Sequence, residues 1–327
     1  MSIQISPDSG TEEDEKQEDK DEETNQTSVE IDTLLENIAA SYVNNSGEWV
    51  IMDMAAYEDL ESDGPKTSDE AKQAYIKKAI ESINKESVGE TTYTKAILAL
   101  TAIGVDAEEL YPEGSKTEIN AIEGLNGKTH SSSTWVAPYT LMAYGQGLNE
   151  STTEYENAVI QAVLKSQKED GSWSSQWDKG VQSTANVIAG LAFYKDREGV
   201  AEAIAKAVDF LASNQRDDGK FYDYDYADAN TEAMAIIGLC AAGVNPDTDE
   251  RFVKNGVSAL DALLSFTLED GSGFGWKDST TLNGGATEQA FRALIAASQV
   301  MKTGEAFNIY DFRHNADDLV PGYAVPV

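Results

Sequence analysis

The chain has 327 residues, and its 58 acidic against 24 basic side chains give a formal net charge of −34. That charge repels phosphate backbones and anionic lipid surfaces, so nucleic acid is excluded as an expected partner. One cysteine allows no internal disulfide, and with only two histidines no zinc ligand set can be assembled, so no metal or cofactor is expected. Since no run of 18 apolar residues occurs, no membrane span is expected either.

Residues 1–28 form a segment of mostly acidic and polar residues, with no aromatic and almost no apolar side chain. Such a segment cannot offset its own ordering entropy, so we expect a disordered acidic spacer. The first residues lack a charged region followed by an apolar one, so no signal peptide is visible.

From residue 29 onward, helical patterning dominates in two alternating kinds of segment. Amphipathic spacing, as in Ile76, Ala79, Ile80 and Ile83, predicts outer helices with one buried face. Segments rich in Ala and Gly are apolar on most sides, which is typical of inner helices packed on both faces. The predicted outer helices are 30–44, 69–86, 117–125, 153–167, 198–214 and 250–267, and the inner ones are 50–59, 92–104, 135–147, 182–195, 230–243 and 286–299.

One stretch of the chain repeats itself. Leu164–Trp173 returns as Leu211–Phe221 and, more loosely, as Leu268–Trp276, each ending with an Asp-Gly turn and an aromatic residue. A unit that recurs every ~45–55 residues indicates a stacked or closed array. Six outer and six inner helices, with no polar capping repeat, predict an all-α (α/α)6 toroid over residues 29–306. Residues 307–327 are expected to be an extended C-terminal tail on the barrel or a linker to a further domain.

The repeated pattern of Gln, Asp-Gly and an aromatic resembles the QW repeat of the squalene cyclase and prenyltransferase α/α-toroid superfamily, which also includes transcobalamin-like proteins. The resemblance implies the toroid fold. It also implies that Gln167 and Gln215 bond to backbone and that Trp173 and Phe221 brace helix ends. It does not settle the function, because this superfamily carries unrelated activities on one scaffold.

The catalytic motifs of these families are missing from the sequence. The segment 222–228 lacks the adjacent acids of the cyclase Asp-x-Asp-Asp, residues 217–221 fail the metal-binding Asp-Asp-x-x-Asp, and no thioester motif occurs. The candidate catalytic residues are Asp225, Glu232 and Glu288. The two glutamates occupy matching places in successive inner helices and could form a glycosidase-like pair. The alternative, which we favour, is that they are first-turn acids facing the helix dipole. His130, in a polar loop, is expected to be solvated, and the alternative is a lyase-type base.

Loops that precede the inner helices carry many aromatic residues. In a toroid these loops gather at one face, where an aromatic and acidic mouth could bind a flat, cationic or glycan ligand. The candidate ligand-binding residues are Trp49, Trp135, Trp177, Tyr222, Tyr224, Tyr226 and Trp276.

The leading hypothesis is a non-catalytic, extracytoplasmic domain of a bacterial surface protein that binds a small molecule, a glycan or a protein. One alternative is a divergent terpene cyclase-like or carbohydrate-active enzyme that uses acidic residues. Another is a structural module of a multidomain surface protein. A pocket with two nearby carboxylates would favour the enzyme, an open aromatic mouth the binding protein, and a filled central channel the structural module.

Overall fold

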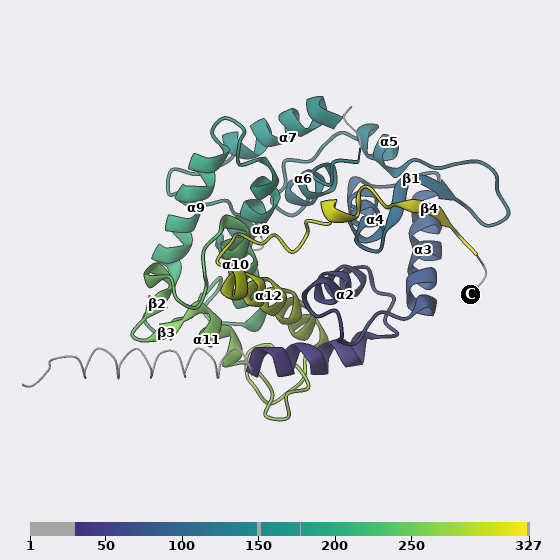
Figure 1. The fold of residues 1–327 in the computed structure, drawn as a ribbon. Coiled ribbons are helices and arrows are strands. Elements are labelled where there is room, and N and C mark those ends of the chain that lie inside the picture. The colour runs from purple at the N-terminus through teal and green to yellow at the C-terminus, as the bar shows by residue number, and fades with distance from the viewer. Residues whose placement is uncertain (1–29, 149–151, 177, 326–327) are drawn as a thin grey trace, which may run out of the picture.

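The computed structural model describes residues 30–148, 152–176 and 178–325, and in these residues the chain forms the expected α/α toroid (Figure 1). Each inner helix packs against the next, and the last packs against the first, so the ring closes. The predicted acidic spacer lies outside the described residues, and the division into spacer, toroid and tail stays a prediction. The inner helices are α2 (Glu48–Leu60), α4 (Glu90–Ala102), α6 (Ala137–Tyr144), α8 (Val181–Leu191), α10 (Ala229–Ala242) and α12 (Gly284–Thr303).

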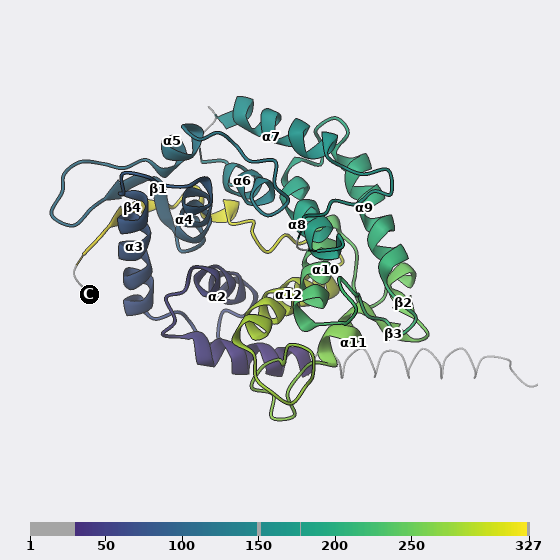
Figure 2. The same ribbon diagram turned by 180° about the vertical axis from the view of Figure 1, so that it is seen from behind.

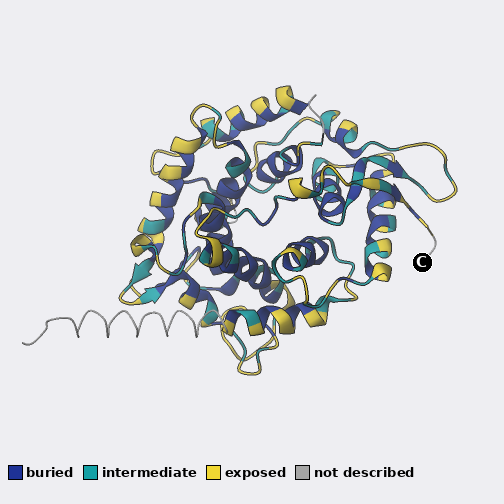
Figure 3. Cartoon of the chain, in the orientation of Figure 1, coloured by how far each residue is buried: buried dark blue, intermediate teal, exposed yellow. Residues whose placement is uncertain are grey.

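The outer helices surround this ring and bury one face each, whereas the inner helices are buried almost all round (Figure 3). Small residues allow the inner helices to approach closely. A Cβ added to Gly190 of α8 would lie 2.7 Å from the Cα of Pro138, and one on Gly238 of α10 would lie 2.8 Å from the Cα of Ala185. The outer helices are residues 30–42, α3 (Asp69–Ile83), α5 (Ala121–Asn126), α7 (Thr153–Lys165), α9 (Val200–Asn214) and α11 (Ala259–Leu264).

The predicted outer helix 250–267 is interrupted in the structure. A 3-10 turn at Glu250–Phe252 leads into the hairpin β2 (Val253–Lys254) and β3 (Val257–Ser258), and α11 follows. The turn residues Asn255 and Gly256 have φ of 52° and 84°, a left-handed geometry that favours a hairpin over a helix. Ser258 and Asp261 then form a capping box that starts α11.

The segment 305–325, named the C-terminal strap, crosses the C-terminal ends of four inner helices (Figure 2). Its backbone and side chains bond in turn to the ends of α10, α8, α6 and α4. The bonds are Phe307 N to Cys240 O, Asn308 Nδ2 to Ala189 O, Gln146 Nε2 to Tyr310 O and Asn315 Nδ2 to Thr101 O. Finally β4 (Val320–Tyr323) pairs in parallel with β1 (Val105–Tyr111).

Two glutamines of the repeated stretch make matching bonds between successive repeats. Gln167 Nε2 donates to Gly171 O at 2.9 Å and to Ala203 O at 2.8 Å. Gln215 Nε2 donates to Gly219 O at 2.8 Å and to Phe252 O at 2.9 Å. Each side chain therefore ties its own Asp-Gly turn to the backbone of the following repeat, the backbone-bonding role that the resemblance implies for these two residues.

No helix within the described ranges combines the length and the apolar content that crossing a membrane requires.

Candidate functional site

A buried ion pair lies in the interior of the ring and joins its first and last inner helices. Arg292 of α12 donates from Nε to Asp53 Oδ1 of α2 at 2.6 Å and from Nη2 to Oδ2 at 2.9 Å. Glu288 Oε1 lies 3.3 Å from the same Nη2. Burial raises the pKa of Asp53 to about 7, while Arg292 acts in the opposite direction. The pair thus closes the toroid by charge as well as by packing.

Aromatic side chains fill the space around this pair. The Arg292 guanidinium lies 4.8 Å from the ring centroid of Trp49, which in turn packs against Tyr139 at 5.3 Å and Tyr310 of the strap at 6.4 Å. Asp53, Arg292, Tyr139 and Tyr310 are all buried. Trp49, a candidate for the ligand mouth, is partly buried and packs against this cluster.

The three candidate catalytic residues lie in different surroundings. Glu232 is fully buried, and its Oε1 accepts a hydrogen bond from Phe221 N at 2.9 Å. Burial raises the pKa of Glu232 well above its usual value, which favours the neutral acid. Glu288 faces Arg292, whereas Asp225 is exposed and lies 3.4 Å from Lys179 Nζ.

Hydrogen bonds also show which residues are equivalent between repeats. Thr184 Oγ1 accepts from Trp173 N at 2.9 Å, and Thr287 Oγ1 accepts from Phe274 N at 3.0 Å, just as Glu232 accepts from Phe221 N. The residue that matches Glu232 is therefore Thr287, one position before Glu288. Glu232 holds a loop against a helix in the way that threonine does elsewhere.

Among the alternating Tyr and Asp residues of 222–228, some side chains are buried and others are exposed. Asp223 is fully buried, and its carboxylate accepts backbone N–H groups of Lys179 at 2.9 Å and Val181 at 3.1 Å, at the start of α8. Asp228 Oδ1 accepts from Thr231 N at 3.0 Å and caps α10. The two aspartates fix the loop, and Tyr224 between them is exposed.

The aromatic residues predicted to line the mouth do not form one cluster in the structure. Tyr224, Tyr226 and Trp276 come together, with Tyr224 stacked on Tyr226 at 5.8 Å between ring centroids and Trp276 edge-on to Tyr226 at 5.9 Å. Tyr222 lies against Arg216, whose guanidinium is 3.7 Å from its ring, and donates to Asp218 Oδ2 at 2.7 Å. Trp177 lies outside the described residues.

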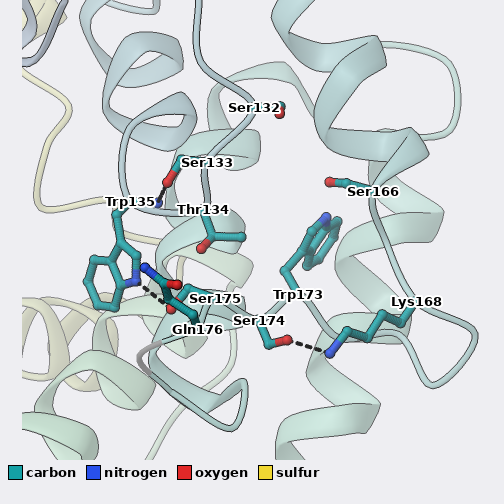
Figure 4. Close-up of a pocket in the computed structure, with 10 residues that line it drawn as sticks. All are labelled: Ser132, Ser133, Thr134, Trp135, Ser166, Lys168, Trp173, Ser174, Ser175 and Gln176. Atoms are coloured by element: carbon teal, nitrogen blue, oxygen red, sulfur yellow. Dashed lines mark hydrogen bonds between the residues drawn. The ribbon is translucent and has the colours of Figure 1, made fainter.

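Trp135 lines a pocket of about 610 Å³ at the N-terminal ends of α6 and α8 (Figure 4). Its indole forms one side, and Trp173 lies across the pocket from it. Trp135 Nε1 donates to Ser175 Oγ at 3.1 Å, and Lys168 Nζ bonds to Ser174 Oγ. The lining residues are Ser132, Ser133, Thr134, Trp135, Ser166, Lys168, Trp173, Ser174, Ser175 and Gln176.

This pocket, named the Trp135 pocket, is built from two fixed loops. Trp173 is buried and donates from Nε1 to Val163 O at 2.9 Å, which attaches its loop to α7. Asn186 Nδ2 of α8 donates to Thr134 O at 2.9 Å and attaches the other loop. The lining therefore combines two tryptophans with several hydroxyl groups, an amide and an ammonium group, and includes no carboxylate.

A second polar cluster, around His130, was not predicted from the sequence. His130 was expected to be solvated, but its side chain is only 11% exposed. His130 Nδ1 lies 3.0 Å from Glu90 Oε1, and Nε2 lies 3.1 Å from the hydroxyl of Tyr144. Glu90 precedes His130 by 40 residues, so only the packing of α4 against α6 brings the two together.

Among the residues that the structure describes, no group of three or more His, Cys, Asp or Glu side chains is arranged to hold a metal ion.

No protein-family model matches the chain, and no curated protein matches it. Solved structures with a similar fold include ent-copalyl diphosphate synthase from Streptomyces platensis, with 18% identity, a TM-score of 0.49 and coverage of 77% of this chain and 50% of that one. Another is an unsaturated glucuronyl hydrolase from Bacillus sp. GL1, with 13% identity, a TM-score of 0.49 and coverage of 86% and 98%. The chain spans about half the length of the synthase, and at these identities the likeness concerns the fold alone.

Proposed function

We propose that this protein is a non-catalytic binding protein that takes a hydroxyl-rich ligand, a glycan, in the Trp135 pocket. The observation that carries the proposal is the lining of that pocket. The apolar face of a sugar ring can stack on the Trp135 indole. Serine and threonine hydroxyls and the Gln176 amide both donate and accept hydrogen bonds, which suits sugar hydroxyls.

The positions of the carboxylates support binding without hydrolysis. Glycoside hydrolysis uses a pair of acidic groups on either side of the scissile bond. The lining residues include none. Glu232 is engaged with Phe221 N, and Glu288 with Arg292, so neither candidate faces the Trp135 pocket as a free acid.

A structural module of a longer surface protein is the second candidate. It is favoured by the interior of the ring, where Asp53, Arg292 and Tyr310 are buried together. The two candidates differ in one respect: only the binding protein requires the Trp135 pocket to hold a ligand.

An extracytoplasmic place at a bacterial surface is part of the proposal. It is supported by the net charge of −34 and by the single cysteine, which is buried and so presents no exposed thiol to oxidising surroundings. Protease treatment of intact cells that make the protein tests it. Cleavage before lysis is the expected result, and full protection until lysis would contradict the proposal.

The binding test is a thermal-shift screen against neutral and acidic oligosaccharides, because a ligand that binds only the folded state raises the Tm. We expect at least one oligosaccharide to raise the Tm of the wild type. The shift should be lost in Trp135→Ala and reduced in Gln176→Ala, whose parent side chain is exposed.

Trp276→Ala is the matched control, because Trp276 lies in the other aromatic group, with Tyr226. It should keep the shift. If no oligosaccharide raises the Tm, or if Trp135→Ala responds like the wild type, the structural module is the better account.

A further inference from the structure

Two aromatic rings form a corner that is separate from the Trp135 pocket. Tyr226, before α10, and Trp276, before α12, have ring centroids 5.9 Å apart and planes at 79° to each other. Tyr224 stacks on Tyr226 at 5.8 Å, with 23° between the planes. Trp276 is 42% exposed, so this aromatic corner is open to solvent.

The corner holds the ammonium group of Lys277. The Lys277 nitrogen lies 3.3 Å from the ring centroid of Tyr226 and 4.0 Å from that of Trp276. Within the described residues this nitrogen has neither a hydrogen-bond acceptor nor a carboxylate partner, although the chain is rich in acids. Attraction between the positive charge and the electron-rich ring faces is therefore what holds it.

Both walls of the corner are fixed by their loops. Ala229 N donates to Trp276 O at 2.8 Å, which ties the wall to the start of α10. At Gly275 a Cβ would lie 1.8 Å from Asp278 O, so the turn that aims Trp276 and Lys277 requires glycine. The loop of Tyr226 is anchored by the capping carboxylates of Asp223 and Asp228. The rings are thus positioned before any ligand arrives, which reduces the entropic cost of binding.

The surroundings of the corner favour positive charge. The pKa of Tyr224 is raised, first by partial burial and then by the negative charges of Asp223 and Asp178. Asp225, between the two tyrosines, is exposed. These carboxylates, together with the net charge of −34, raise the local concentration of cations.

We propose that the aromatic corner of Tyr226 and Trp276 is a binding site for a methylated ammonium group, and that Lys277 occupies it when no ligand is bound. A primary ammonium group carries three N–H donors, and here they find no protein acceptor. Lys277 is exposed, so water must take these donors, whereas a trimethylammonium group has no N–H to keep hydrated and gains the same ring contacts at a smaller cost in lost hydration. This site is independent of the glycan proposal, because it shares no residue with the lining of the Trp135 pocket.

The test is a calorimetric titration of the full chain with choline and, in parallel, with trimethyllysine. Binding of choline would indicate that the methylated ammonium group comes from a small molecule or a lipid headgroup. Binding of trimethyllysine would indicate that it comes from a protein. We expect at least one to bind in the millimolar range. Dimethylbutanol, the neutral carbon isostere of choline, should not bind, because charge rather than shape drives the contact.

Two variants distinguish the corner from a general acidic surface. Lys277→Gln removes the ammonium group that competes for the corner. The affinity for the methylated cation should therefore rise several-fold, because the ligand no longer has to displace Lys277. Trp276→Ala removes one wall and should weaken binding about tenfold or abolish it. Trp135→Ala should bind as the wild type does, and the Tm of each variant reports that it is folded.

The proposal is overturned if neither cation binds, or if the neutral isostere binds as well as choline. Unchanged or weaker binding in Lys277→Gln would also overturn it, as would full affinity in Trp276→Ala. None of these results bears on whether oligosaccharides bind in the Trp135 pocket.

Discussion

Replacement of Gln215 by alanine should destabilise the toroid more than the same replacement of Gln167 or Gln73. The Gln215 amide is 6% exposed and donates to two backbone carbonyls, those of Gly219 and Phe252. Each neutral hydrogen bond contributes about 1 kcal/mol, and each carbonyl left unpaired in a buried place costs about 1–3 kcal/mol. The Gln215 Oε1 already has no partner, so its removal offsets part of the loss. We therefore expect the free energy of unfolding to fall by about 2–4 kcal/mol.

Gln167→Ala is the internal comparison, because Gln167 makes the matching pair of bonds but is only half-buried. Water can replace its contacts, so the expected loss is about 1–2 kcal/mol. Gln73 is exposed on α3, and Gln73→Ala should stay within about 0.5 kcal/mol of the wild type. Urea unfolding, with circular dichroism as the signal, measures all three. A loss at Gln215 no larger than at Gln73, or larger at Gln167 than at Gln215, would refute the reasoning.

Three further changes test other parts of the account. Glu232 has a folded-state pKa well above 4.5, so the stability that its neutral form supplies is complete at low pH and is lost as pH rises through the folded pKa. Glu232→Gln keeps an acceptor for Phe221 N and should make unfolding less sensitive to pH; an unchanged pH dependence would contradict this. Arg292→Met leaves Asp53 buried without its partner and should lower the free energy of unfolding by about 3–5 kcal/mol. In a double-mutant cycle, adding Asp53→Leu should recover much of this loss. Gly238→Ala places a methyl group against Ala185 and should lower the free energy of unfolding by about 1–3 kcal/mol, and a neutral result would show that α8 and α10 are not in close backbone contact.

Most of the ring was predictable because periodicity reports burial directly. The segment 230–243 lies within one residue of α10 at each end, and 286–299 lies inside the longer α12, since apolar residues on all sides specify a helix packed on both faces. The hairpin at 253–258 was missed although Asn255-Gly256 is a turn signal, because the apolar residues around it also fit a helical spacing. The pairing of β1 with β4 joins segments more than 200 residues apart in sequence, and no local pattern indicates it.

The candidate site was predictable only in part. Trp135 lies in a loop before an inner helix, as its position in the sequence indicates, but the sequence did not show that Ser174 and Ser175 would line the same pocket. Trp49 lies at the start of an inner helix in the same way, but it packs against Arg292 and Tyr310, which come from distant parts of the chain. Which members of the Tyr-Asp alternation point inward could not be read from the sequence. Asp223, rather than Asp225, is buried because its partners are the free N–H groups at the start of α8.

Titration of the oligosaccharide that stabilises the protein most, measured by calorimetry on the wild type and on Trp135→Ala, tests the central claim most directly. The account predicts saturable binding by the wild type and a loss of at least about tenfold in affinity in the variant, since stacking on an aromatic ring together with the burial of its apolar face contributes more than about 1.4 kcal/mol. Equal affinity in the two proteins, or no heat of binding in the wild type, would contradict it.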